Sequence, residues 1–248
     1  MRALAIVLSG VLCLLLAGCG GVSKREAAGL MPKESPADLY VDTAAAYYQR
    51  GQMDAALDRG LRAVAEDKNN PRAHYVLAIV YQRLGRKDEA EKHFTEAVRL
   101  DPNNPDFLNA QGTVLCLQNR YADAITQFDK ALANPLYKTP EVALMNAADC
   151  SRRAHQSGEY ERYLRQALTA RPDYAPALFG MAKLSFERGA DPDARNYMAR
   201  YSRVGAVTPE ALLLASQIEA RLGNRAESRA IANTLRQRFP DAPEIMQL

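Results

Sequence analysis

A repeat of 34 residues constrains this chain more than any other feature of its sequence. With residues 139 and 140 skipped, six windows of that length cover residues 37–242: 37–70, 71–104, 105–138, 141–174, 175–208 and 209–242. The second window shows the pattern most completely, with Leu77, Ala78, Tyr81, Gly85, Ala90, Phe94, Ala97 and Pro102. Such a period is typical of an architecture in which each repeat is one supersecondary unit.

Each recurring position has a physical role in a pair of helices. Glycine near position 15 suits the left-handed turn after a first helix, and proline at position 32 stops a second helix. Small residues at positions 8 and 20 let the paired helices approach, while large apolar residues at positions 7, 11 and 24 fill the space between pairs. One hairpin cannot bury both faces, so hairpins stack on one another. The pattern resembles the tetratricopeptide repeat (TPR) and predicts an all-α superhelix of about six helix hairpins.

The fourth unit, 141–174, departs from this pattern. Tyr160 occupies position 20, and Gly158 lies three residues after position 15. These departures predict a displaced loop or a bent hairpin. Residues 243–248 follow the sixth unit as a C-terminal tail that is too short for a full capping helix.

The first residues have the features of a lipoprotein signal peptide, predicted as 1–18. Ala3 to Leu16 is an apolar run too short for a transmembrane helix of ~20 residues. The sequence Leu-Ala-Gly-Cys that ends at Cys19 resembles the bacterial lipobox, which predicts lipidation of Cys19; the alternative is a plain signal peptide with a chance cysteine. Gly20, rather than Asp, after the cysteine favours the outer membrane. Residues 19–36, interrupted by glycine and proline, are predicted as the lipidated N-terminus and a flexible tether.

Composition and motifs argue against several classes of function. The 32 Lys and Arg residues are balanced by 29 Asp and Glu residues without a basic patch, so we expect no nucleic-acid partner. The three histidines lack metal-ligand spacing, and no phosphate-binding loop or nucleophile elbow is present in the sequence. We expect a non-enzymatic protein with no catalytic residues, metal, cofactor or small-molecule substrate. His74 and His93 fall within one hairpin and are interpreted as ordinary packing or surface residues.

Two cysteines remain after Cys13 is assigned to the signal peptide and Cys19 to the lipid. Cys116 and Cys150 lie 34 residues apart, on the first helices of the third and fourth units. First helices of neighbouring hairpins run side by side, so the two side chains are placed to face each other. An oxidising periplasm favours a disulfide, and two buried, inert thiols are the alternative.

A groove on the concave side of the superhelix is the candidate protein-binding site. First-helix positions 2, 5, 9, 12 and 13 face this side in such repeats, and tyrosine and arginine are frequent anchors of interfaces. Such a groove suits an extended or helical peptide. The alternative is that these residues are solvated or pack locally. The candidate residues are Val41, Tyr48, Tyr75, Ile79, Gln82, Arg83, Asn109 and Leu117.

The lipobox and several local runs together resemble one family, the type IV pilus biogenesis/stability lipoproteins, which are pilotins built of six TPR units. The runs are 112–116 (Gly-Thr-Val-Leu-Cys), 119–124 (Asn-Arg-Tyr-Ala-Asp-Ala), 134–137 (Asn-Pro-Leu-Tyr) with Pro140, 146–150 (Asn-Ala-Ala-Asp-Cys) and 239–241 (Phe-Pro-Asp). The resemblance places Cys116 and Cys150 at family cysteine positions and so favours the disulfide. Gly158 and Tyr160 depart from the family's fourth hairpin.

The resemblance implies a role without catalysis at the outer membrane. Pilotins bind secretin subunits and promote assembly of the pore through which the pilus emerges. The expected partners are therefore a secretin of the type IV pilus machinery and the outer-membrane lipid that holds acylated Cys19, with the protein facing the periplasm. The alternative is a general periplasmic TPR adaptor for cell-wall hydrolases or outer-membrane assembly proteins.

Overall fold

The computed structural model describes residues 35–248. The predicted signal peptide 1–18, the lipidation site at Cys19 and the predicted tether as far as residue 34 lie outside these described residues. Pro36, which was assigned to the tether, is instead the first residue of a helix. Proline is favoured there because the N–H groups of a first helical turn have no carbonyl partner within the helix.

The described part of the chain contains twelve α-helices, one short 3₁₀-helix and no strand. The elements are α2 (Pro36–Gln49), α3 (Met53–Glu66), α4 (Pro71–Arg83), α5 (Lys87–Leu100), α6 (Pro105–Leu117), α7 (Tyr121–Leu132), α8 (Pro140–Arg153), α9 (Ser157–Ala170), α10 (Ala175–Glu187), α11 (Asp191–Val204), α12 (Pro209–Arg221), α13 (Arg225–Arg238) and η1 (Pro243–Gln247). None of the helices described is long and apolar enough to cross a membrane. The predicted all-α fold is confirmed.

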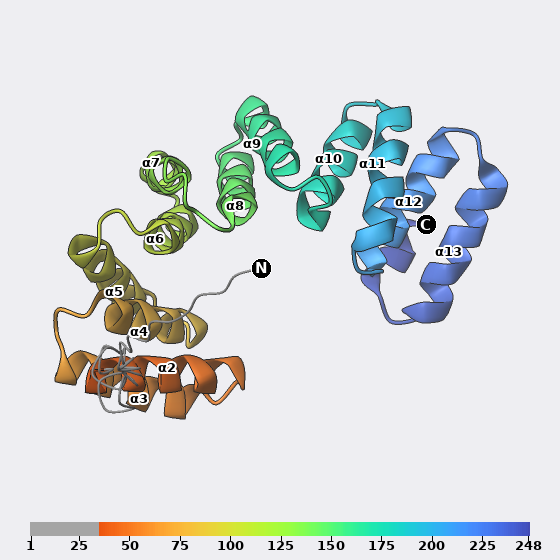
Figure 1. Cartoon of the computed structure of the whole chain (residues 1–248). Helices are drawn as coiled ribbons and strands as arrows, with labels where there is room; N and C mark the ends of the chain where they lie inside the picture. The colour runs from red at the N-terminus through yellow and green to blue at the C-terminus, as the bar shows by residue number, and fades with distance from the viewer. Residues whose placement is uncertain (1–34) are drawn as a thin grey trace, which may run out of the picture. The chain divides into compact units, whose positions relative to one another are not determined.

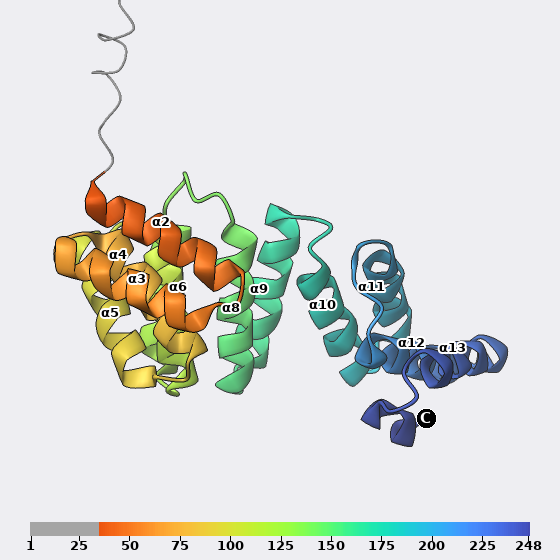
Figure 2. The ribbon, with the colours of Figure 1, turned by 90° about the horizontal axis from the view of Figure 1, so that it is seen from below.

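Consecutive helices pair into six hairpins, from α2 with α3 to α12 with α13, and each hairpin packs against the next. Within residues 36–248 the hairpins follow one another along a curve, with α4, α6 and α8 on its inner side and α5, α7 and α9 on its outer side (Figure 1). The C-terminal tail forms η1, which packs against α12 and α13 (Figure 2). This stack is the predicted TPR superhelix.

Capping residues set where the first helices begin. Asn70 Oδ1 accepts a hydrogen bond from the backbone N–H of Ala73 at 3.1 Å, and Asn104 Oδ1 accepts one from that of Phe107 at 3.4 Å. Proline follows each asparagine as the first residue of α4 and α6. An asparagine cap followed by proline is a strong helix start, because it satisfies an otherwise unpaired N–H and fixes φ.

The turn of the fourth hairpin is regular, so the predicted displaced loop is wrong. Position 15 of the repeat is left-handed in the turns of all six hairpins, and it holds Gly51, Gly85, Asn119, His155, Gly189 and Gly223. In the fourth unit His155 adopts a φ of 57°. Histidine and asparagine tolerate this region better than most side chains. The chain therefore turns in register without glycine, and Gly158 lies within α9.

Tyr160 fits at its small-residue position because the next hairpin makes room for it. A Cβ atom on Gly180 of α10 would lie 3.0 Å from Tyr160 Oη and 2.9 Å from Leu164 Cδ2. The missing side chain on α10 therefore compensates for the large one on α9. The predicted bend of the hairpin is not needed and is not observed, since α8 and α9 pack along their lengths.

A disulfide between Cys116 and Cys150 ties the third hairpin to the fourth. The two Cα atoms are 5.7 Å apart, and both cysteines are buried. They belong to the largest apolar cluster of the described residues, to which α6 through α10 contribute. The centre of the stack thus combines its largest core with a covalent link.

Candidate functional site

Side chains from three helices surround a cavity of about 510 Å³ near the N-terminal end of the superhelix. Helices α2 and α4 form its walls, and the first turn of α6 closes one end. We call it the N-terminal groove. It brings together four of the eight predicted groove residues, Val41, Tyr48, Tyr75 and Ile79, and places the ring of Phe107 beside them.

Tyr75 is the central aromatic residue of this groove. Its ring centroid lies 4.8 Å from that of Phe107 and 5.9 Å from that of Phe94. Burial raises the pKa of Tyr75 to about 12, so its phenol stays uncharged even in solutions more basic than its ordinary pKa of 10. Tyr48 and Ile79 are half-buried and present apolar surface beside it. The groove therefore offers aromatic and aliphatic surface that is only partly covered.

Val41 forms the floor of the groove rather than a free contact surface. Its side chain is only 5% exposed and packs with Ala44, Ala63 and Val76 in a small core between the first two hairpins. Packing alone thus accounts for an apolar residue at this position.

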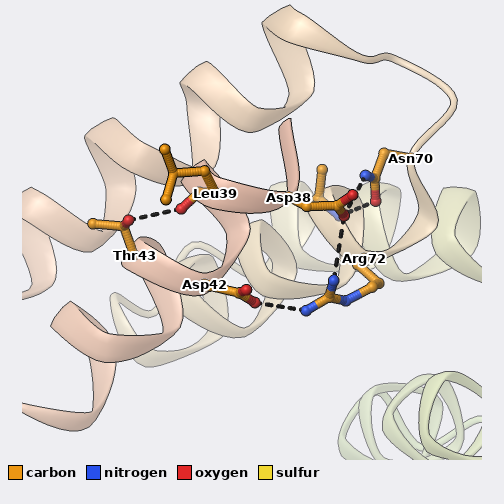
Figure 3. A network of polar contacts seen from close by, with 7 residues as sticks. Asp38, Leu39, Asp42, Thr43, Asn70 and Arg72 are labelled. Atoms are coloured by element: carbon orange, nitrogen blue, oxygen red, sulfur yellow. Dashed lines mark hydrogen bonds and ion pairs between the residues drawn. The ribbon is translucent and has the colours of Figure 1, made fainter. Parts of the chain in front are cut away.

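Polar contacts at the edge of the groove hold its two walls together (Figure 3). Arg72 of α4 donates to Asp38 Oδ1 at 3.2 Å and to Asp42 Oδ1 at 2.6 Å, both on α2. Asn70 Nδ2 also donates to Asp38 Oδ1, at 3.1 Å. The guanidinium of Arg72 is therefore engaged within the protein. Its contribution to stability is modest, because exposed ion pairs contribute ~0–1 kcal/mol each.

The other four predicted groove residues lie outside the N-terminal groove. Gln82 and Arg83 are exposed at the C-terminal end of α4, and Leu117 is 53% exposed at the end of α6. Asn109 Oδ1 accepts a hydrogen bond of 2.9 Å from Asn146, which joins α6 to α8. Counting positions along a first helix does not show where that helix ends or which neighbour contacts it.

The repeat positions do not predict Phe107 as a groove residue, because it is the third residue of its unit and position 3 is not among the positions expected to face the groove. Its position depends on the start of α6, where Asn104 and Pro105 fix the first helical turn. The Asn-Pro pair was visible in the sequence, and it is the signal that locates this side chain.

A pair of histidines lies in the second hairpin, away from the groove. His74 Nδ1 and His93 Nδ1 are 2.9 Å apart and share a hydrogen bond, while His74 Nε2 lies 3.0 Å from the carbonyl oxygen of Lys68. The ring of His93 also stacks on Tyr81, with centroids 5.6 Å apart. Burial, together with His74 and Lys92, lowers the pKa of His93 to about 4. These are packing residues, but their packing depends on protonation.

We expect acid to weaken the fold through His93. Its ordinary pKa of 6.5 applies to the unfolded chain, so between pH 6.5 and about 4 the unfolded state binds a proton that the folded state does not. The free energy of unfolding therefore falls as pH decreases through this window. The measurement is a series of urea titrations, each at a fixed pH between 6.5 and about 4. Over this range the free energy of unfolding of His93→Asn should fall less than that of the wild type. Equal losses in both proteins would contradict this assignment.

The described residues contain no cluster of three or more His, Cys, Asp or Glu side chains arranged to hold a metal ion. The N-terminal groove combines tyrosine rings and aliphatic side chains with the ion pair between Arg72 and Asp42. Such a surface is suited to binding a chain segment by burial of apolar area.

Models of the tetratricopeptide repeat match three stretches of the chain. Two are described as tetratricopeptide repeat and match residues 75–138 and 210–242, and one is described as TPR repeat and matches residues 44–85. These models describe repeats rather than a catalytic domain. The hairpin stack and its groove therefore define a TPR protein of the protein-binding class.

Known proteins of similar sequence and structure narrow this class. The crystal structure of PilW, described as a widely conserved type IV pilus biogenesis factor, is 31% identical, with a TM-score of 0.79 over 87% of this chain and 99% of PilW. The type IV pilus assembly protein PilF of Pseudomonas aeruginosa is 22% identical over 215 residues, which are 87% of this chain and 85% of PilF. The solved structure of Pseudomonas aeruginosa PilF, 23% identical, has the same fold, with a TM-score of 0.79 over 85% of this chain and 95% of that one. The chain belongs to the family of TPR proteins of type IV pilus biogenesis.

Proposed function

We propose that this protein is a pilotin, an outer-membrane lipoprotein that faces the periplasm and is anchored through acylated Cys19. It binds secretin subunits and promotes their localisation and multimerisation at the outer membrane during type IV pilus biogenesis. The observation that carries the proposal is the N-terminal groove, whose partly covered Tyr48, Tyr75 and Ile79 lie in a chain of the pilus biogenesis family.

The mechanism requires binding and anchoring rather than chemistry. An apolar segment of a secretin subunit buries surface against the tyrosines, while the lipid on Cys19 restricts the complex to the membrane surface. Tethering raises the effective concentration of a weakly bound subunit, to the millimolar range for a short flexible linker. Subunits gathered in this way meet one another more often and assemble.

The function is tested by the amount of heat- and detergent-resistant secretin multimer in outer membranes, with and without this gene. We expect multimers to be lost on deletion and restored by the wild type but not by Cys19→Ala. Unchanged multimers together with normal pili would rule out the pilotin role.

The groove is tested by Tyr48→Ala, because Tyr48 contributes surface to the groove and takes part in none of the aromatic ring pairs that hold Tyr75. We expect binding to the isolated secretin periplasmic domains to weaken by about 1–2 kcal/mol, as for a tyrosine anchor in an interface. Leu117→Ala is the matched control, since it removes an exposed apolar side chain outside the groove. Equal affinities for Tyr48→Ala and the wild type would exclude this groove as the secretin site.

A further inference from the structure

Two adjoining cavities lie in the C-terminal half of the superhelix. The first, of about 480 Å³, lies between α8 and α10, and the second, of about 380 Å³, lies between α10, α12 and η1. Phe179, Lys183, Glu187 and Glu210 line both cavities, so the two form one continuous depression. We call it the C-terminal groove. It is built from different hairpins than the N-terminal groove.

The floor of the C-terminal groove is apolar. Phe179 lies at the junction of the two cavities and is half-buried, and its ring centroid lies 5.3 Å from that of Tyr201. Met145 lies at the α8 end, and Leu213 and Phe186 lie at the α12 end. An apolar side chain of a ligand placed over Phe179 would contact this apolar floor, with Lys183, Glu187 and Glu210 close by at the junction.

The walls of the C-terminal groove carry an excess of negative charge. Its carboxylates are those of Asp149, Glu187, Glu210 and Glu244, against the cations of Arg152 and Lys183. Lys183 pairs with Glu210 at 3.1 Å, and Arg152 pairs with Asp149 at 3.7 Å. In the described part of the chain, Glu187 and Glu244 have no cation within ion-pairing distance. Two carboxylates therefore flank an apolar floor without a counter-charge.

We propose that the C-terminal groove binds a segment of a partner protein in which lysine or arginine flanks an apolar residue. The apolar side chain packs on Phe179, and the flanking cations pair with Glu187 and Glu244. Opposite charge selects this class of segment over an acidic one and increases its association rate. The protein then holds two segments at once, one in each groove. This inference is independent of the identity of the ligand in the N-terminal groove.

The probe is a fluorescein-labelled peptide, Lys-Leu-Lys-Phe-Lys-Ala, and its counterpart is the same peptide with glutamate in place of each lysine. Fluorescence anisotropy measures binding to residues 19–248 carrying Cys19→Ser. We expect the lysine peptide to bind, the glutamate peptide not to bind, and added salt to weaken the complex. Equal binding of both peptides, or no binding of the lysine peptide, would overturn the proposal.

Matched variants locate the site. The double variant Glu187→Gln/Glu244→Gln should weaken binding of the lysine peptide about tenfold, as expected for two partly exposed charge pairs. The control Glu66→Gln/Asp241→Asn removes two exposed carboxylates outside both grooves and should leave affinity unchanged. Tyr48→Ala should also leave it unchanged. A loss of binding in Tyr48→Ala would place the peptide in the N-terminal groove and refute the assignment.

Discussion

Gly112→Val lowers the free energy of unfolding by roughly 3 kcal/mol, the largest effect expected of a single substitution here. Gly112 lies on α6 against the second helix of its own hairpin. A Cβ atom there would lie 2.7 Å and 2.9 Å from two ring carbons of Phe128, and 3.1 Å from the backbone oxygen of Ala124. Phe128 is fully buried, so its ring cannot turn away into solvent. The added side chain must therefore separate α6 from α7.

The measurement is a guanidinium titration followed by far-UV circular dichroism. Gly158→Val is the matched control, because a Cβ atom at Gly158 meets nothing within 4 Å, and its effect should stay within about 0.5 kcal/mol. The double variant Gly112→Val/Phe128→Leu should lose less free energy of unfolding than the two single variants lose in sum, because leucine at position 128 relieves the clash with valine at position 112. A wild-type midpoint for Gly112→Val would show that the two helices do not pack as closely as described.

Cys116→Ala/Cys150→Ala should lower the free energy of unfolding by about 2–4 kcal/mol. The disulfide joins two residues that are 34 positions apart and so restricts the conformations of the unfolded chain. Removing it restores this conformational entropy to the unfolded state and so favours unfolding. The cysteines are buried between α6 and α8, so the loss affects the junction of the third and fourth hairpins.

The comparison with reductant makes this prediction specific. Dithiothreitol should lower the unfolding midpoint of the wild type by a similar amount and leave the double variant unchanged. The protein for both measurements begins at residue 20, so that Cys116 and Cys150 are its only cysteines. A wild type that is insensitive to reductant while the variant is destabilised would assign the effect to packing rather than to the bond.

The fold could be predicted from the sequence because its period is set by local chemistry. Glycine, proline and small residues at fixed positions mark where each helix ends and where two helices approach, and these signals need no knowledge of distant contacts. The fourth hairpin shows the limit of this reasoning. His155 takes a backbone conformation that glycine takes elsewhere, and Tyr160 depends on Gly180 in the following repeat. A pattern within one unit does not reveal a compensation made by the next unit.

The candidate site was predicted in part for a similar reason. Tyr48, Tyr75 and Ile79 meet in one groove because the positions that they occupy face the same side of neighbouring helices. Phe107 depends instead on where α6 begins, and Asn109 depends on the spacing between hairpins, which sets whether its side chain bonds to the next helix. That spacing is decided by the bulk of the packed side chains and not by the repeat period.

Within residues 35–248 the first hairpin stands at the end of the array, because it has a single neighbouring hairpin there, and Arg72 bridges α4 to α2 across their contact. In a linear array of repeats, a terminal unit opens more easily than a central one. A ligand in the N-terminal groove touches α2, α4 and α6 together, so its binding free energy adds to the cost of opening α2. The amide protons of α2 then exchange with solvent more slowly as the groove fills. The ligand concentration at which the α2 amide protons become protected from exchange therefore measures the affinity of the groove for that ligand.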